Sequence, residues 1–168
     1  MSNDNNTQRT REIAKRVTLT EINGIEEFEQ GEGDMATKYA HLPTGEKVNR
    51  VFVVGTLTGL RELDNGSIML TVVDNVGNDV KAFTGEYNLE AHRTAKQLLD
   101  EDGVPPEFIF IVGKLSESSD YQVPSISPEF IRTVSKEEIN HARQDITDAV
   151  ADRDVTEEVQ RVIDENRN

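Results

Sequence analysis

The sequence predicts a mainly β fold in the form of a small barrel, on three observations. Residues 48–60 are the most strand-like stretch of the chain, and Gly55 interrupts their apolar run. Asp64-Asn65-Gly66 gives a strong hairpin signal ahead of a second alternating stretch. The elements then follow as three strands, a helix and two more strands, the order of a five-stranded OB-fold barrel with a helix between strands three and four.

The strand over residues 48–60 has two different faces, because side chains alternate along a strand. Val51, Val53 and Leu57 share one face, which we expect to form the barrel core. Gly55 suits the sharp coiling that lets one strand serve both sides of a small barrel. The other face carries a cation, an aromatic ring and a hydroxyl group, from Arg50, Phe52 and Thr56.

Three further strands and a turn complete the central part of the expected barrel. Alternation predicts strands over residues 67–74 and 80–84, and between them Gly77 supplies the permissive backbone of a turn. A nearly continuous apolar run predicts the fourth strand over residues 108–115.

The fifth strand and the region before the barrel are less regular. The fifth strand covers residues 121–134, and we expect it at a sheet edge because it contains Pro124 and Pro128. Residues 15–22 fit either a helix or a strand, and their alternation favours a strand. Residues 38–42 are expected to be short and extended.

Two regions carry helix signals. Asn88 is an N-cap for a helix over residues 89–99, whose expected apolar stripe is Leu89, His92, Ala95 and Leu99. Residues 135–138, Ser-Lys-Glu-Glu, form a capping box that begins a C-terminal helix. Asp154 is expected to cap a further short helix over residues 155–163.

These elements divide the chain into four expected parts. Residues 1–10 are polar and rich in Asn, which predicts disorder. Residues 11–47 form an N-terminal extension that packs on the barrel. Residues 48–134 form the OB-fold domain, and residues 135–168 form a C-terminal helical segment.

The composition is strongly acidic, with 32 Asp and Glu residues against 18 Lys and Arg and a net charge of −14. Such a surface repels free nucleic acid on average. The acidic residues are spread over the whole chain, which is typical of halophilic proteins. At about 1 M salt the Debye length is roughly 3 Å, so net charge no longer steers partners. An acidic protein adapted to ordinary salt is the alternative.

The sequence disfavours catalysis. Cysteine is absent, which excludes disulfides and thiolate chemistry. His41, His92 and His141 lie in different elements without metal-ligand spacing, and no phosphate-binding glycine loop occurs. We therefore expect no enzyme activity, no cofactor and no metal. With neither an apolar span nor a signal-peptide pattern, the expected location is the cytoplasm.

Six segments carry a family resemblance, and the most specific is LPTGEKVNRVFVVGTLT over residues 42–58. The chain is similar in these segments to the haloarchaeal replication protein A-associated proteins, which are OB-fold proteins encoded beside replication protein A. It departs from the family pattern at Phe83-Thr84, where relatives carry Tyr before Ala-Gly, and at Ser127, where they carry Arg. The other five segments are REIAKRV (11–17), VVD with its turn (72–77), AFTGEY (82–87), PPEFIFIVGK (105–114) and SPEFI (127–131).

The resemblance implies an accessory partner of replication protein A that acts with it on single-stranded DNA in replication and repair. It implies neither a membrane nor a small-molecule substrate. The alternative is a scaffold that stabilises replication protein A through the barrel and the C-terminal helix without direct DNA contact.

OB-folds bind single strands on the face of strands two and three and at the flanking loops. Phe83 is the preferred stacking ring, because one base on an aromatic side chain is worth about 1–3 kcal/mol. Arg61 is placed in the loop between strands one and two. Alternation and loop position give the candidates for DNA contact: Arg50, Phe52, Thr56, Arg61, Thr71, Lys81, Phe83, Lys114 and Tyr121.

Each candidate has a structural alternative. Phe83 fits equally well as a ring packed beneath a flanking segment. Phe52 fits as a ring covered by the N-terminal segment, and the four cations fit as solvated charges. In the C-terminal helix, one apolar face either binds the protein partner or packs on the chain's own barrel, and it consists of Ile139, Ala142, Ile146 and Val150.

Overall fold

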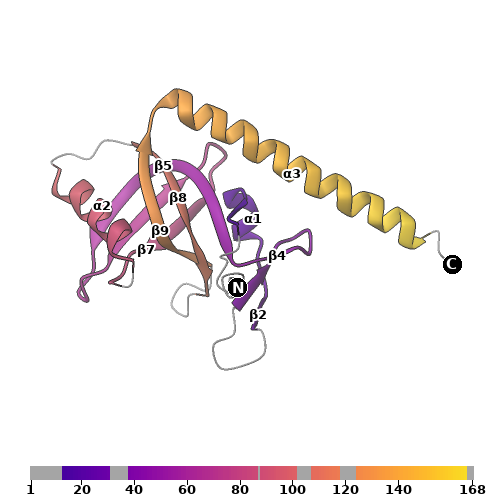
Figure 1. The fold of residues 1–168 in the computed structure, drawn as a ribbon, viewed down its shortest axis with the longest axis horizontal. Coiled ribbons are helices and arrows are strands. Elements are labelled where there is room, and N and C mark those ends of the chain that lie inside the picture. Colours follow the sequence, from indigo (N-terminus) through magenta and orange to yellow (C-terminus); the bar gives the residue numbers. More distant parts are fainter. Residues whose placement is uncertain (1–12, 31–37, 87, 102–106, 118–123, 166–168) are drawn as a thin grey trace, which may run out of the picture.

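The computed structural model describes residues 13–30, 38–86, 88–101, 107–117 and 124–165, so the expected disorder of residues 1–10 lies outside the described residues. Over these ranges the chain is mainly β, with a sheet of six strands, a sheet of three strands and three helices. The larger sheet curves around a core, and α3 runs along one side of it (Figure 1).

A three-strand meander forms the first half of the larger sheet. It consists of β5 (Arg50–Glu62), β6 (Ile68–Val73) and β7 (Asp79–Phe83). Both connecting turns use a glycine with positive φ, 89° at Gly66 and 96° at Gly77. The predicted hairpin turns are confirmed, because only a residue without a side chain adopts these angles without strain.

In the second half of the larger sheet, the strand pairings lead from β7 back to β5. β7 pairs in parallel with β9 (Ser125–Val134), β9 pairs antiparallel with β8 (Glu107–Ser116), and β8 pairs antiparallel with β5. The pairings therefore run from β5 through β6, β7, β9 and β8 and close again on β5. This closed circuit places the inward side chains of all five strands around one core.

The expectation that the fifth strand lies at a sheet edge is wrong for its first residues. Ser125 and Ile126 pair with β7 on one side and with β8 on the other. Pro128 is tolerated because it follows the pairing with β7 and faces Gly113, where the ladder with β8 shifts register.

β5 coils at Gly55. Residues 50–57 pair with β8, and residues 56–62 pair with β6. A Cβ atom on Gly55 would lie 2.6 Å from Val72 Cγ1 and 2.6 Å from the Val73 carbonyl oxygen, so the two strands approach closely because no side chain separates them. The predicted core face of this strand is confirmed, since its three apolar members are at most 1% exposed: Val51, Val53 and Leu57.

The expected strand over residues 15–22 is wrong. A two-residue strand, β1 (Lys15–Arg16), pairs in parallel with β5, and α1 (Leu19–Asn23) follows it. Thr18 ends the extended segment because it forms a capping box with Glu21: the Thr18 hydroxyl accepts from the Glu21 N–H, and the Glu21 carboxylate accepts from the Thr18 N–H, both at 3.0 Å.

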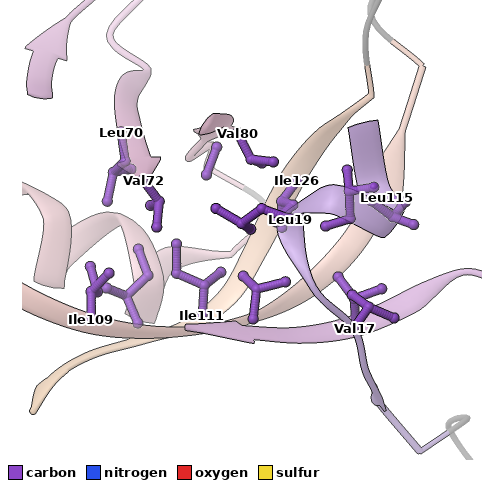
Figure 2. Close-up of a cluster of buried hydrophobic side chains, with 14 of the residues drawn as sticks. Val17, Leu19, Leu70, Val72, Val80, Ile109, Ile111, Leu115 and Ile126 are labelled. Atoms are coloured by element: carbon purple, nitrogen blue, oxygen red, sulfur yellow. The ribbon is translucent and has the colours of Figure 1, made fainter. Parts of the chain in front are cut away.

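The N-terminal segment contributes to the core of the larger sheet. Val17, Leu19 and Ile22 are at most 2% exposed and belong to the same apolar cluster as the inward residues of the strands. Figure 2 shows Val17 and Leu19 among side chains from β6, β7, β8 and β9. The smaller sheet follows this segment and consists of β2 (Phe28–Gln30), β3 (Lys38–His41) and β4 (Lys47–Val48).

The expected helix between strands three and four is α2 (Leu89–Asp100). Its buried face differs from the expected stripe, because Ala91, Ala95 and Leu98 are buried whereas Leu89 is 53% exposed. The Thr84 hydroxyl ties the helix to the meander: it accepts from the Ile68 N–H at 3.1 Å and lies 2.7 Å from His92 Nδ1. This bond and the small alanines hold α2 close to the sheet.

The C-terminal region forms one helix of 30 residues, α3 (Lys136–Glu165), so the expectation of a separate short helix after Asp154 is wrong. The predicted capping box is confirmed: the Glu138 N–H donates to Ser135 Oγ at 3.1 Å, and the Ser135 N–H donates to Glu138 Oε1 at 3.0 Å. The helix passes α1 and continues beyond the sheet (Figure 1). Within the described ranges, no helix is long and apolar enough for a bilayer crossing.

We expect Gly55→Ala to lower the free energy of unfolding by about 1–3 kcal/mol, because its methyl group overlaps Val72 and the Val73 carbonyl. Urea unfolding measures the loss. Gly59→Ala is the control on the same strand, since its Cβ meets only the Thr71 side chain, at 3.2 Å. Equal losses for both variants would contradict a close approach specific to Gly55.

We expect the capping box of α3 to make stability depend on pH. The hydrogen bond from the Ser135 N–H holds the pKa of Glu138 below its ordinary value of 4.5, and nearby Arg132 adds to this. The stabilisation is therefore present above that value and is lost as the pH falls through the folded-state pKa.

Urea midpoints of the wild type and of Glu138→Gln test this, because Gln keeps the capping geometry without the charge. The two midpoints should differ near neutral pH and converge in acid. Glu137→Gln, one residue away, is the control. A difference that stays constant with pH would contradict the prediction.

Candidate nucleic-acid interface

The outward residues of the three-strand meander lie in register across β5, β6 and β7. Gly59 stands beside Thr71, and Thr71 stands beside Lys81. We call this surface the meander face. Its three rows are Arg61–Met69–Phe83, Gly59–Thr71–Lys81 and Thr56–Val73–Asp79.

The meander face carries two cations close to an aromatic ring. Arg61 is exposed, and in the described part of the chain no carboxylate lies within ion-pair distance of it. The Lys81 ammonium group is held by its neighbours on the sheet, because its Nζ donates to Thr71 Oγ1 at 3.0 Å and lies 3.6 Å from Asp79 Oδ2. Phe83 is half-buried and stands in the same row as Arg61, with Met69 between them.

The centre of the meander face has no side chain at Gly59. This position lies between the rows of Arg61 and Thr56. A Cβ atom there would lie 3.2 Å from Thr71 Oγ1. The Thr71 side chain therefore lies close against the Gly59 backbone.

A bulge in β5 determines which residues belong to this face. The register with β6 shifts between Leu57 and Gly59, so the residues that point outward change from even to odd numbers. Arg61 consequently lies within β5 and on the meander face, which corrects its expected position in a loop. Gly59 was not among the residues selected from the sequence, because uniform alternation hides the bulge. Met69 was not selected either, although alternation places it on the same face as Thr71.

Phe52 lies on a different surface from Phe83. Its side chain points outward from the first half of β5, where the partner strand is β8, and its ring meets Phe110 edge to face at 5.2 Å and 87°. The expected alternative, that Phe52 is covered, fits the structure, but the covering element is α3 rather than the N-terminal segment.

Arg50 and Lys114 are also remote from the meander face. Arg50 Nε donates to Glu129 Oε1 at 2.6 Å, and the two side chains are 20% and 14% exposed. Lys114 is paired with Arg50 across β5 and β8 and is exposed. Thr56 stands at the junction, because it pairs with both Val73 and Phe108. Tyr121 lies outside the described residues.

The apolar face of α3 is occupied by the chain's own sheet. Ile139, Ala142 and Ile146 are at most 8% exposed and cluster with Val54. The partly buried side chains around this cluster are Phe52, Phe108, Phe110, Val134 and Val150. Ile139, Ala142 and Ile146 therefore pack on the chain's own sheet, the alternative given for this helix, and Val150 packs against the same cluster.

His41 and His92 make structural contacts. His41 Nε2 lies 3.0 Å from Glu29 Oε1, and hydrogen bonds from Lys47 and His41 hold the pKa of Glu29 below its ordinary value. His92 contacts the Thr84 hydroxyl. Among the residues that the structure describes, no three His, Asp or Glu side chains converge as metal ligands do.

No protein-family model matches the chain, and no curated protein sequence matches it. The fold is similar to a solved structure of the Stn1–Ten1 complex of S. pombe, with a TM-score of 0.59 and 13% identity over 94% of this chain and 100% of that chain. It is also similar to a chain in the structure of a replication protein A heterotrimer bound to single-stranded DNA, with a TM-score of 0.57 and 16% identity over 84% of this chain and 98% of that one. These likenesses identify the fold as that of OB-fold proteins.

We expect Arg50→Met to lower the free energy of unfolding by about 1–3 kcal/mol, because it leaves the largely buried Glu129 carboxylate without its guanidinium partner. Lys114→Met, at the exposed neighbouring position of the same row, is the control and should change stability little. Urea unfolding of both variants measures the difference. A larger loss for Lys114→Met would contradict this assignment of Arg50.

Proposed function

We propose that this chain is a five-stranded OB-fold barrel that binds single-stranded DNA on its meander face as an accessory partner of replication protein A. The observation that supports it most is the strand register. It brings Arg61, Lys81 and Phe83 onto one face of the sheet, the face of strands two and three on which OB-folds bind single strands.

The binding free energy of such a contact depends mainly on the Phe83 ring. A base stacked on Phe83 contributes about 1–3 kcal/mol and is read without sequence preference. Arg61 and Lys81 lie on the same face to contact phosphates and set the position of the strand. With a net charge of −14, the chain repels DNA at long range in dilute salt. At about 1 M salt that repulsion is screened within roughly 3 Å, while stacking persists.

Two observations support replication protein A as the partner. The chain resembles haloarchaeal replication protein A-associated proteins in residues 42–58 and in shorter segments. Its fold is similar to chains of two multi-subunit complexes, one of them a replication protein A heterotrimer bound to single-stranded DNA. We propose a binding role rather than catalysis. Among the described residues, His41 and His92 form structural contacts, and no three His, Asp or Glu side chains converge.

A second candidate is a scaffold that stabilises replication protein A without touching DNA. The length of α3 favours it. The first half of the helix is fixed on the sheet by Ile139, Ala142 and Ile146, and its helical backbone continues to Glu165, beyond the sheet (Figure 1). The helix is thus anchored at one end and continues past its own domain. Its second part is therefore in a position to contact a protein partner.

Binding to labelled oligo-dT in multimolar KCl separates the two candidates. We expect the wild type to bind without a partner, and Phe83→Ala to weaken binding by a factor of about 5–150, the equivalent of about 1–3 kcal/mol. Phe130→Ala is the matched control, because Phe130 is 40% exposed on β9 and lies off the meander face.

The opposite outcome is equally informative. Binding that requires added replication protein A and is unaffected by Phe83→Ala would rule out the meander face as the DNA contact and favour the scaffold. Equal losses for Phe83→Ala and Phe130→Ala would show that the effect is not specific to the proposed face.

A further inference from the structure

A pocket of about 190 Å³ lies between the start of α1, the turn that joins β6 to β7, and α3. Its floor is aliphatic and includes Leu19, Val54 and Ile146. Hydroxyl groups, Asp74 and Arg143 stand around the rim. Beside them Val76 is 73% exposed at the tip of the turn. The pocket is thus an apolar hole with a polar rim, separate from the rows that carry Phe83 and Lys81.

The walls of the pocket are fixed. Asp74 Oδ1 accepts from the Val76 N–H at 3.0 Å and from the Asn78 N–H at 2.8 Å, which holds the turn in shape. Asn78 Nδ2 donates to Thr20 Oγ1 at 2.7 Å, which joins the turn to α1. The third wall, α3, is anchored by its own buried face. A ligand would therefore enter a preformed site at little cost in ordering.

Arg143 gives the rim an available positive charge. Its guanidinium lies 5.9 Å from the centre of the Phe108 ring, and in the described part of the chain it forms no ion pair. The other charged group of the rim, Asp74, is already engaged: it accepts from two backbone N–H groups and from the Asn78 amide. An anionic group at the mouth of the pocket would find Arg143 as its partner.

The size and the lining of the pocket together indicate which class of ligand it binds. Pockets for small molecules and cofactors usually measure about 300–1,000 Å³, so this pocket suits a single side chain better. Among the described residues, its lining includes no aromatic ring on which a nucleobase would stack. Apolar pockets with polar rims receive the anchor residues of protein partners.

We propose that this pocket holds one large apolar side chain from an acidic segment of a partner protein, whose neighbouring carboxylate pairs with Arg143. Val76 extends the apolar contact at the mouth. The site does not depend on DNA binding by the meander face. Because the chain carries a net charge of −14 and repels acidic ligands in general, such a segment binds only where the anchor and Arg143 act together.

The test uses three synthetic peptides and the full chain. The probe peptide has one Phe flanked by Glu and Asp; a second has Ala in place of Phe, and a third has Lys in place of the acids. We expect the first alone to shift the amide NMR signals of Val76 and Thr147. Fluorescence anisotropy then gives its affinity.

Two substitutions alter the pocket. Arg143→Glu reverses the charge, and Thr147→Phe fills the mouth from an exposed position of α3. Each should weaken the probe at least about fivefold. The matched controls are Arg93→Glu on α2 and Asn140→Phe on α3, both exposed and outside the pocket. They should leave the affinity unchanged, and circular dichroism confirms that all four variants fold.

Several outcomes would overturn the proposal. One is equal weakening by pocket and control variants, and another is tighter binding of the Lys peptide. A shift of the Val76 and Thr147 signals by oligo-dT instead of the peptide would assign the pocket to nucleic acid. Concentration-dependent self-association that Thr147→Phe abolishes would make a second copy of the chain the occupant. None of these results bears on whether Phe83 stacks with DNA, so the two proposals fail separately.

Discussion

The close approach of β5 to β6 at Gly55 is the constraint on which the rest of the structure depends. Because no side chain separates the strands there, β5 leaves β8 and continues along β6 without a break. The two halves of the strand then face different directions. One outward surface belongs to the meander, and the other lies beneath α3.

The division between these two surfaces separates Phe83 from the other outward aromatic rings. Phe52, Phe108 and Phe110 all point away from the core of the larger sheet, and α3 packs on them. Burial of these apolar side chains holds α3 on the sheet, and polar side chains at the same positions would not do so. Phe83 points outward from a strand that α3 does not cover, so an outward position alone does not define a binding residue.

Much of the fold was predictable because local chemistry determined it. The hairpin turns at Gly66 and Gly77, the capping box at Ser135 and the core face of β5 all follow from short-range rules. The bulge at Gly59 was not predictable, because it depends on how β6 pairs with β5. The Thr18–Glu21 capping box was visible in the sequence and would have replaced the expected strand by α1. Only some of the candidate residues lie together on the meander face, since membership of a face depends on register.

The short β1 also protects the molecule from unwanted association. Residues 50–55 of β5 have β8 on one side, and on the other side the ladder with β6 has not yet begun. β1 pairs there with Val51 and Phe52, the Val17 N–H donates to the Phe52 carbonyl, and Lys15 forms an ion pair with Glu46. An open edge of apolar strand invites pairing with another chain. By occupying this edge, the N-terminal segment limits strand exchange and aggregation.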